Sequence, residues 1–210
     1  MVYCMKVYFI RHGESVLTDK RYQPPDTPLS DLGIKQATMV AQRITHLPVE
    51  LILTSTYIRA LQTAQAIVKM TSVPLIKNDL LTERKMPSQF MGKFIDDPEV
   101  VPIHQTIREH FYDPQWHYAE EENFPDLLSR VKLALDLILS QKKEHIVVVT
   151  HGYFLSVLIF YVLFGDQADP PLFTAFRDHA ICSNASITTC EYNNPEWKLL
   201  SWNDYAHLEE

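Results

Sequence analysis

Two stretches of this sequence decide its fold. The first reads Val7-Tyr8-Phe9-Ile10-Arg11-His12-Gly13-Glu14, and the second, far along the chain, reads His145-Ile146-Val147-Val148-Val149-Thr150-His151-Gly152. In each stretch, a short apolar run rich in β-forming residues stops at a histidine, and the glycine after it permits a sharp exit. Open α/β sheets place their ligands beyond the carboxyl ends of such strands. We therefore expect two neighbouring buried strands that bring His12 and His151 together.

The segments around these stretches alternate between strand and helix patterns. Ser30 is predicted to cap an amphipathic helix that carries Ile34, Ala37, Val40, Ala41 and Ile44. Short apolar runs at 51–53 and 74–76 predict strands, and helical periods are predicted over 58–70, from Pro125 onward and over 153–164. Residues 186–192 and 197–202 are typical of a closing hairpin. Strands that alternate with helices indicate the α/β class.

The length of 210 residues fits one domain, and 46% hydrophobic with 21% charged residues is the balance of a packed globule. From about residue 84 to 123 the pattern loosens into Met, Pro and aromatic residues, which we interpret as a cap-like insertion covering the site. Two interpretations of its large apolar residues stay open, pocket lining for a less polar substrate or packing beneath the cap. These residues are Phe90, Met91, Phe94, Phe111, Tyr112, Trp116 and Tyr118.

Charge and cysteine content argue against several classes of function. A formal net charge of −7 opposes a general affinity for nucleic acid or an anionic membrane, and no stretch approaches the length of a membrane span. Three cysteines without C-x-x-C spacing indicate reduced thiols rather than a disulfide framework or a zinc site. The N-terminal segment lacks the pattern of a secretion signal, so we expect a cytoplasmic protein.

The run Arg11-His12-Gly13-Glu14 resembles the signature of the histidine phosphatase superfamily, which includes the cofactor-dependent phosphoglycerate mutases. Four later segments are similar to that family in the same order: Asp26-x-Pro28-Leu29-Ser30-x-x-Gly33-x-x-Gln36-Ala37, Ser55-x-x-x-Arg59-Ala60-x-x-Thr63-Ala64, Leu81-x-Glu83 and Thr150-His151-Gly152. The resemblance implies a three-layer α/β/α sandwich with a mostly parallel central sheet. It also implies a single domain over residues 1–210.

The resemblance further implies that His12 is a nucleophile that becomes phosphorylated, with Arg11, Arg59 and His151 binding the phosphoryl group. A phosphomonoester is a dianion, and arginines offer it bidentate contacts. Two guanidiniums and a protonated His151 around His12 disfavour its cationic form, so the imidazole stays a neutral nucleophile. Because these groups already stabilise the developing charge, we expect no metal and no other cofactor.

By the same resemblance, Glu83 donates a proton to the leaving alkoxide and later activates water. Two alternatives stay open. Glu83 is an exposed loop carboxylate paired with Arg84, or Glu14, which follows the signature histidine closely, is the acid.

Several positions depart from the mutase branch of this family. Gln23-Pro24-Pro25 replaces its sugar-phosphate contacts, and Tyr153 puts a bulky ring where mutases have Asn. Beyond Arg84, the insertion offers only Lys85, Lys93 and Arg108 as cations, so we expect no second anchor for a bisphosphate. The sequence therefore predicts a phosphatase for a small phosphomonoester, with a mutase or a non-catalytic phosphate-binding protein as alternatives. It predicts no nucleic-acid or membrane partner, and it leaves the substrate and the oligomeric state open.

Overall fold

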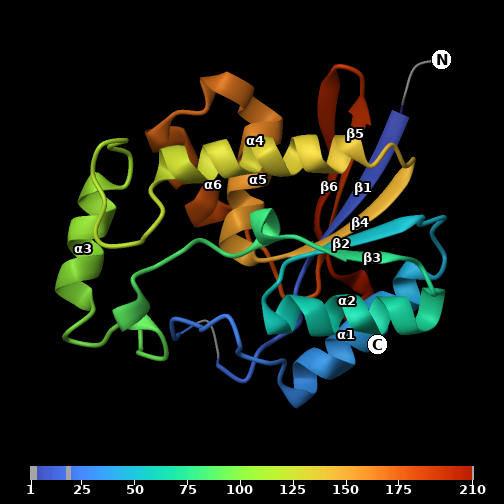
Figure 1. Ribbon diagram of the computed structural model, residues 1–210, viewed down its shortest axis with the longest axis horizontal. Coiled ribbons are helices and arrows are strands. Elements are labelled where there is room, and N and C mark those ends of the chain that lie inside the picture. The colour runs from blue at the N-terminus through green and yellow to red at the C-terminus, as the bar shows by residue number, and fades with distance from the viewer. Residues whose placement is uncertain (1–3, 18–19, 210) are drawn as a thin grey trace.

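The structure is a computed structural model and describes residues 4–17 and 20–209. Its centre is a six-stranded sheet in the order β3-β2-β4-β1-β5-β6 (Figure 1). The first four of these strands pair in parallel, whereas β5 runs antiparallel to β1 and β6 antiparallel to β5. The strands are β1 Cys4–Arg11, β2 Leu51–Thr54, β3 Leu75–Lys77, β4 His145–Thr150, β5 Ile187–Asn193 and β6 Glu196–Asp204.

Helices cover both faces of the sheet. In Figure 1, α1 and α2 lie below it, α4, α5 and α6 lie above it, and α3 stands to one side. The helices are α1 Asp31–Ile44, α2 Ile58–Thr71, α3 Val101–His110, α4 Phe124–Ser140, α5 Gly152–Phe164 and α6 Pro170–His179. The predicted three-layer α/β/α sandwich is confirmed. Among the helices of the described residues, none has both the length and the apolar character needed to cross a bilayer.

The residues of β1 alternate between the two cores of the molecule. Met5, Val7 and Phe9 pack with α4 and α5, whereas Tyr8 and Ile10 pack with α1 and α2. Both faces of the strand are therefore buried, which is why its sequence is an apolar run rather than an alternating one. The same physical reason explains the run of valines in β4.

Most predicted elements are present, with ends that differ by a few residues. Ser30 caps α1, since its Oγ accepts the N–H of Gly33 at 3.0 Å. The prediction that Ile34 lies on the buried face of α1 is wrong, because it is 53% exposed. The sequence interpretation also missed α3 and α6. Each of these two helices has a single fully buried apolar residue, Ile107 and Phe173, and so gives little hydrophobic periodicity.

Close backbone contacts fix the turn after β1. A Cβ atom on Gly13 would lie 2.6 Å from the carbonyl oxygen of Gly33, and one on Gly33 would lie 1.9 Å from that of Glu14. Any larger residue would push the turn away from the start of α1. The Gly13 N–H also donates to Thr63 Oγ1 on α2 at 3.1 Å, so this turn is held by both helices of one layer.

Residues 84–123 build a small core of their own. Phe90, Val100 and Ile107 are buried together, and Trp116 and Tyr118 pack against them. The segment contains α3 and lies at one end of the sheet, on the left of Figure 1.

Candidate active site

His12 lies immediately beyond β1, with its imidazole in one tautomer. Its Nδ1 is 2.7 Å from the carbonyl oxygen of Gly13, which only accepts hydrogen bonds, so Nδ1 carries the proton. Arg59 Nε donates to the other ring nitrogen, Nε2, at 3.2 Å. Burial, and then the charges of Arg59 and Arg11, hold the pKa of His12 well below its usual value. The ring is therefore a neutral imidazole at neutral pH, with its lone pair on Nε2.

Two arginines from different elements meet at His12. Arg11 ends β1, and its Nη1 donates to the carbonyl oxygen of Cys182 at 2.5 Å. Arg59 lies in the first turn of α2, is only 2% exposed, and donates from Nη1 to the carbonyl oxygen of Pro24 at 3.1 Å. A Cβ atom on Gly152 would lie 3.1 Å from Arg11 Nε, so glycine lets α5 start against this guanidinium. Both positive charges are therefore held in fixed positions.

The register of β1 and β4 brings His151 beside His12. Arg11 is paired with Thr150, and the two imidazole centroids are 5.0 Å apart. His151 Nε2 lies 2.8 Å from the Ser55 hydroxyl, a contact that the sequence interpretation missed. Burial, followed by the charges of Arg59 and His12, holds the pKa of His151 well below its usual value. The expectation of a protonated His151 is therefore wrong for the protein without a ligand. A bound phosphate dianion would raise the pKa of His151 again.

The carboxylate of Glu83 lies at the N-terminus of α5. Its Oε2 accepts the N–H of Tyr153 at 3.1 Å, and its Oε1 accepts those of Phe154 and Arg84, both at 2.9 Å. A carboxylate has about four lone-pair positions, so one position on Oε2 is left for a proton. The pairing of Glu83 with the Arg84 side chain is wrong, because the Arg84 guanidinium pairs with Glu121 at 3.2 Å.

Glu14, the other candidate acid, lies in the turn after β1 and contacts the start of α1. Its Oε1 accepts the hydroxyl of Ser30 at 2.8 Å, and its N–H donates to the side chain of Gln36 at 2.8 Å. Glu83, in contrast, lines the cavity that also contains His12. The geometry thus favours Glu83 over Glu14 as a proton donor.

Arg130 on α4 holds the loop that carries Glu83. Its Nη1 donates to the carbonyl oxygens of Leu80 at 3.0 Å and Thr82 at 2.7 Å, and its Nη2 donates to that of Glu83 at 3.3 Å. Its Nε and Nη2 also bind the two carboxylate oxygens of Glu122 at 2.7 and 2.8 Å. Sequence reasoning missed Arg130, because nothing local in an amphipathic helix marks an arginine whose carbonyl partners lie about 50 residues away.

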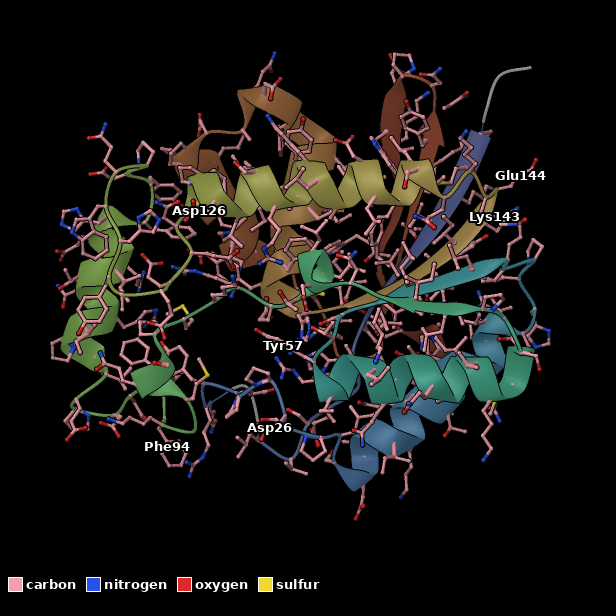
Figure 2. All side chains as sticks on the ribbon, viewed as in Figure 1. Asp26, Tyr57, Phe94, Asp126, Lys143 and Glu144 are labelled. Carbon is pink, nitrogen blue, oxygen red and sulfur yellow. The ribbon has the colours of Figure 1, made fainter. Side chains whose placement is uncertain are left out.

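A cavity of about 790 Å³ opens beside these groups and is lined by Arg11, His12, Arg59 and Glu83 among others. Tyr57, at the start of α2 and near the centre of Figure 2, also lines it. Segment 84–123 contributes Arg84, Lys85, Met86, Ser88, Met91, Ile95, His104 and Glu120 to its wall. His151 is fully buried beside His12 and Tyr57.

Most aromatic residues of segment 84–123 pack internally and do not face a ligand. Phe90, Trp116 and Tyr118 belong to the small core of the segment, and Phe111 packs in the main core. Of the seven large apolar residues singled out in the sequence, Met91 alone lines the cavity. The rest of the cavity's large apolar wall comes from Tyr22, Tyr57, Met86, Ile95, Tyr153 and Ile181.

The cavity wall carries more positive charge than the sequence predicted. In addition to Arg11 and Arg59, it contains Arg21, Arg84, Lys85 and Arg177, against the acidic Glu83, Glu120 and Asp178. The expectation that further cations are missing around the site is therefore wrong. Arg21 and Arg177 lie outside the insertion in sequence, and the fold brings them to the wall of the cavity. A chain with a net charge of −7 thus has a cavity with a net positive lining.

Within residues 4–17 and 20–209, no group of three or more His, Cys, Asp and Glu is arranged to hold a metal ion. Cys4, Cys182 and Cys190 are free thiols. Burial raises the pKa of Cys182 to about 11, so this cavity-lining thiol is a poor nucleophile at neutral pH.

The site's class follows from a neutral imidazole set between two fixed guanidiniums, which suits attack on a phosphoryl group. The family model of the histidine phosphatase superfamily (branch 1) matches residues 7–205, and the chain belongs to that superfamily. A probable phosphoglycerate mutase, GpmB, of Proteus mirabilis is 26% identical over 219 residues, which cover 98% of this chain and 96% of the relative.

Solved structures with the same fold include phosphatases. A phosphoserine phosphatase variant from Entamoeba histolytica, solved with phosphoserine, has a TM-score of 0.76 and 26% identity over 97% of this chain and 99% of its own. YhfR from Bacillus stearothermophilus has a TM-score of 0.83 with 23% identity and covers 98% of this chain and all of its own. The relatives of this protein in the superfamily therefore include proteins named as phosphatases and proteins named as mutases.

Proposed function

We propose that this protein is a phosphatase that hydrolyses a small phosphomonoester through a phosphohistidine on His12. The observation that carries the proposal is the His12 ring, kept neutral and oriented by the Gly13 carbonyl, with Arg59 at its Nε2. Phosphoryl transfer requires an available lone pair and fixed positive charge around the transferred oxygens. The similarity to a phosphoserine phosphatase supports hydrolysis.

In the first step, Arg59 gives up its hydrogen bond to His12 Nε2 and turns its donors to the phosphoryl oxygens. Nε2 then forms a bond to phosphorus while the ester P–O bond breaks. Arg11 and Arg59 stabilise the charge on the phosphoryl oxygens, and His151 adds a hydrogen-bond donor beside them. The leaving oxygen takes the proton from Glu83 Oε2 and departs as an alcohol. The product is a phosphohistidine and an ionised Glu83.

In the second step, water attacks phosphorus and gives its proton to Glu83. The P–N bond breaks, His12 regains the lone pair on Nε2, and inorganic phosphate is released. The protein's own cations provide the charge stabilisation in both steps. We therefore expect the hydrolysis rate to be the same with and without EDTA, and strict recovery of activity on adding a divalent ion would contradict the mechanism.

The apolar part of the cavity wall favours leaving groups with apolar surface. Burial of such surface contributes about 25 cal/mol per Å². Because Met86, Met91 and the neighbouring tyrosines offer that surface, naphthyl phosphate should have a higher kcat/KM than methyl phosphate, which carries no second charge and little apolar surface. Direct competition between the two esters, with phosphate release as the readout, measures this preference.

A mutase is the second candidate function. It is favoured by the relatives named as probable phosphoglycerate mutases and by the additional cations of the cavity wall, which suit a bisphosphate. Analysis of products from 3-phosphoglycerate separates the two reactions. Interconversion with 2-phosphoglycerate without net phosphate release would establish the mutase, and net release of phosphate would establish the phosphatase. Tight phosphate-ester binding without turnover would indicate a binding protein instead.

A further inference from the structure

Arg177 is a cation at the cavity wall that the proposed reaction does not use. It lies in the last turn of α6, is exposed, and lines the cavity. Its guanidinium carbon is 4.8 Å from the ring centroid of Tyr153, which itself lines the cavity. Tyr153 follows Gly152 and donates its N–H to Glu83, so this one residue contacts both Glu83 and Arg177.

No acidic side chain forms an ion pair with Arg177 within the described part of the chain, although the neighbouring Asp178 also lines the cavity. Each ion pair found there involves other cations, including Arg84 with Glu121 and Arg130 with Glu122. Arg84 also contacts the Tyr153 ring, at 5.3 Å, but its charge is balanced by its partner. Arg177 is therefore the arginine next to Tyr153 whose charge is available to a ligand.

The wall between Arg177 and the phosphoryl-binding Arg11 is continuous. Ala180, Ile181 and Cys182 line the cavity, and the Cys182 carbonyl accepts from Arg11. Arg177 and Arg11 therefore line the same cavity, and the residues between Arg177 and the Cys182 carbonyl form part of its wall. Burial raises the pKa of Cys182, and the charges of Arg11 and, to a smaller extent, Arg177 oppose this effect.

We propose that Arg177 binds a second anionic group, a carboxylate or a phosphate, on the leaving group of the substrate. The proposal rests on the proposed function, since it assigns the reacting phosphate to Arg11, Arg59 and His12. A position in the last turn of α6 also places Arg177 favourably in the helix dipole. The helix dipole alone does not explain the contact of the Arg177 guanidinium with the Tyr153 ring, and Tyr153 lines the cavity.

The test uses pairs of esters that differ in one anionic group. 3-(Phosphonooxy)propanoate is compared with its carboxamide, and propane-1,3-diyl bisphosphate is compared with 3-hydroxypropyl phosphate. Arg177→Gln should lower kcat/KM for the doubly anionic esters by about tenfold or more, because a hydrogen bond to a charged group contributes about 1.5–3 kcal/mol. Turnover of the carboxamide and hydroxypropyl esters should stay unchanged. The carboxylate and bisphosphate arms identify which anion Arg177 prefers.

Arg108→Gln is the matched control, since it removes the same charge from α3 at a position outside the cavity wall. It should leave both kinds of ester unaffected, whereas Arg177→Lys should retain part of the preference. An equal loss of activity on charged and neutral esters in Arg177→Gln would overturn the proposal.

A binding measurement separates failure of this inference from failure of the proposed function. Calorimetry with 4-phosphonobutanoate and 4-phosphonobutanamide, which cannot be hydrolysed, compares the native protein with Arg177→Gln. The native protein should bind the carboxylate more tightly, and the variant should lose that difference. If the two ligands bind equally to the native protein, the inference is wrong even where esters are hydrolysed. If the difference is present but no ester is turned over, the proposed hydrolysis is wrong.

Discussion

The cavity has two walls that are built in different ways. One wall comes from the ends of β1 and β4 and the start of α2, where His12, His151 and Arg59 are at most 3% exposed. The other comes from segment 84–123, whose contributing side chains, such as Lys85 and Ile95, are largely exposed or half-buried and sit on turns around a small separate core. Regular elements hold side chains more rigidly than loops do.

This difference separates the reaction from the choice of substrate. The charges that act on phosphorus are fixed by the sheet and its first helices, where a small displacement is costly because both faces are close-packed. In the proposed reaction the segment wall faces the leaving group, so substitutions there should change specificity without removing catalysis. Changes at the two walls should therefore have effects of different size and kind.

The largest effect is expected at His12. His12→Ala removes the nucleophile, so turnover and covalent phosphorylation should both be lost, whereas unfolding should remain cooperative. Rapid quench with labelled ester should trap an acid-labile, base-stable adduct in the native protein and none in the variant. His110→Ala, on α3 in the other wall region, is a control that should still form the adduct. An acid-stable serine ester would assign the chemistry to a different residue.

Glu83→Gln should have the next largest effect. It keeps the size of the side chain and removes the transferable proton, so turnover of alkyl esters should fall by about 10²–10⁴. p-Nitrophenyl phosphate has a good leaving group that needs little protonation, and formation of its phosphoenzyme should slow less. The measurement is the pre-steady-state rate with both esters. If neither rate changes, Glu83 is not the acid, and Glu14→Gln becomes the variant to examine.

Arg130 connects the two walls, because it binds the Glu83 loop and the Glu122 carboxylate at the end of segment 84–123. Arg130→Met should shift Glu83 and slow alkyl esters by about tenfold, with a smaller effect on nitrophenyl phosphate, since a misplaced acid is costly mainly where protonation is needed. The paired variant Arg130→Met with Glu122→Gln avoids an unpaired buried carboxylate. Lys132→Met, which removes an exposed cation from the same helix, is the control. Equal slowing of both esters would argue against a role through Glu83.

The wall that carries His12, His151 and Arg59 was largely predictable from the sequence, because its residues follow directly after recognisable strands or belong to a short motif. Strands buried on both faces read as apolar runs, and Arg11-His12-Gly13 and His151-Gly152 follow them directly in the chain. Their alignment in the sheet then follows from the parallel pairing of β1 and β4. Glu83 also ends an apolar run, although its contacts with the N–H groups of α5 could not be seen.

The rest of the site depends on contacts between distant residues. Ser55 meets His151 across 96 positions, and the Arg130 contacts with the acid loop span about 50. Arg177 belongs to α6, a helix with little hydrophobic periodicity, whose place beside the cavity depends on tertiary packing. For the aromatic residues of segment 84–123 the sequence left both interpretations open, because composition alone does not say whether a ring packs or lines a cavity.

The smallest expected effect concerns stability and the buried histidines. Because the pKa values of His12 and His151 are lowered in the folded protein, the unfolded chain binds protons below its ordinary histidine pKa while the folded protein does not. Stability should therefore decrease as pH falls below about 6.5, by at most about 1.4 kcal/mol per pH unit for each histidine. Urea unfolding between pH 7.5 and 5 should show a weaker pH dependence in His151→Gln than in the native protein. The control His46→Gln removes an exposed histidine and should keep the native dependence. Identical slopes in His151→Gln and the native protein would mean that His151 has the same pKa in the folded and unfolded protein. The conclusion that this wall is desolvated would then be wrong.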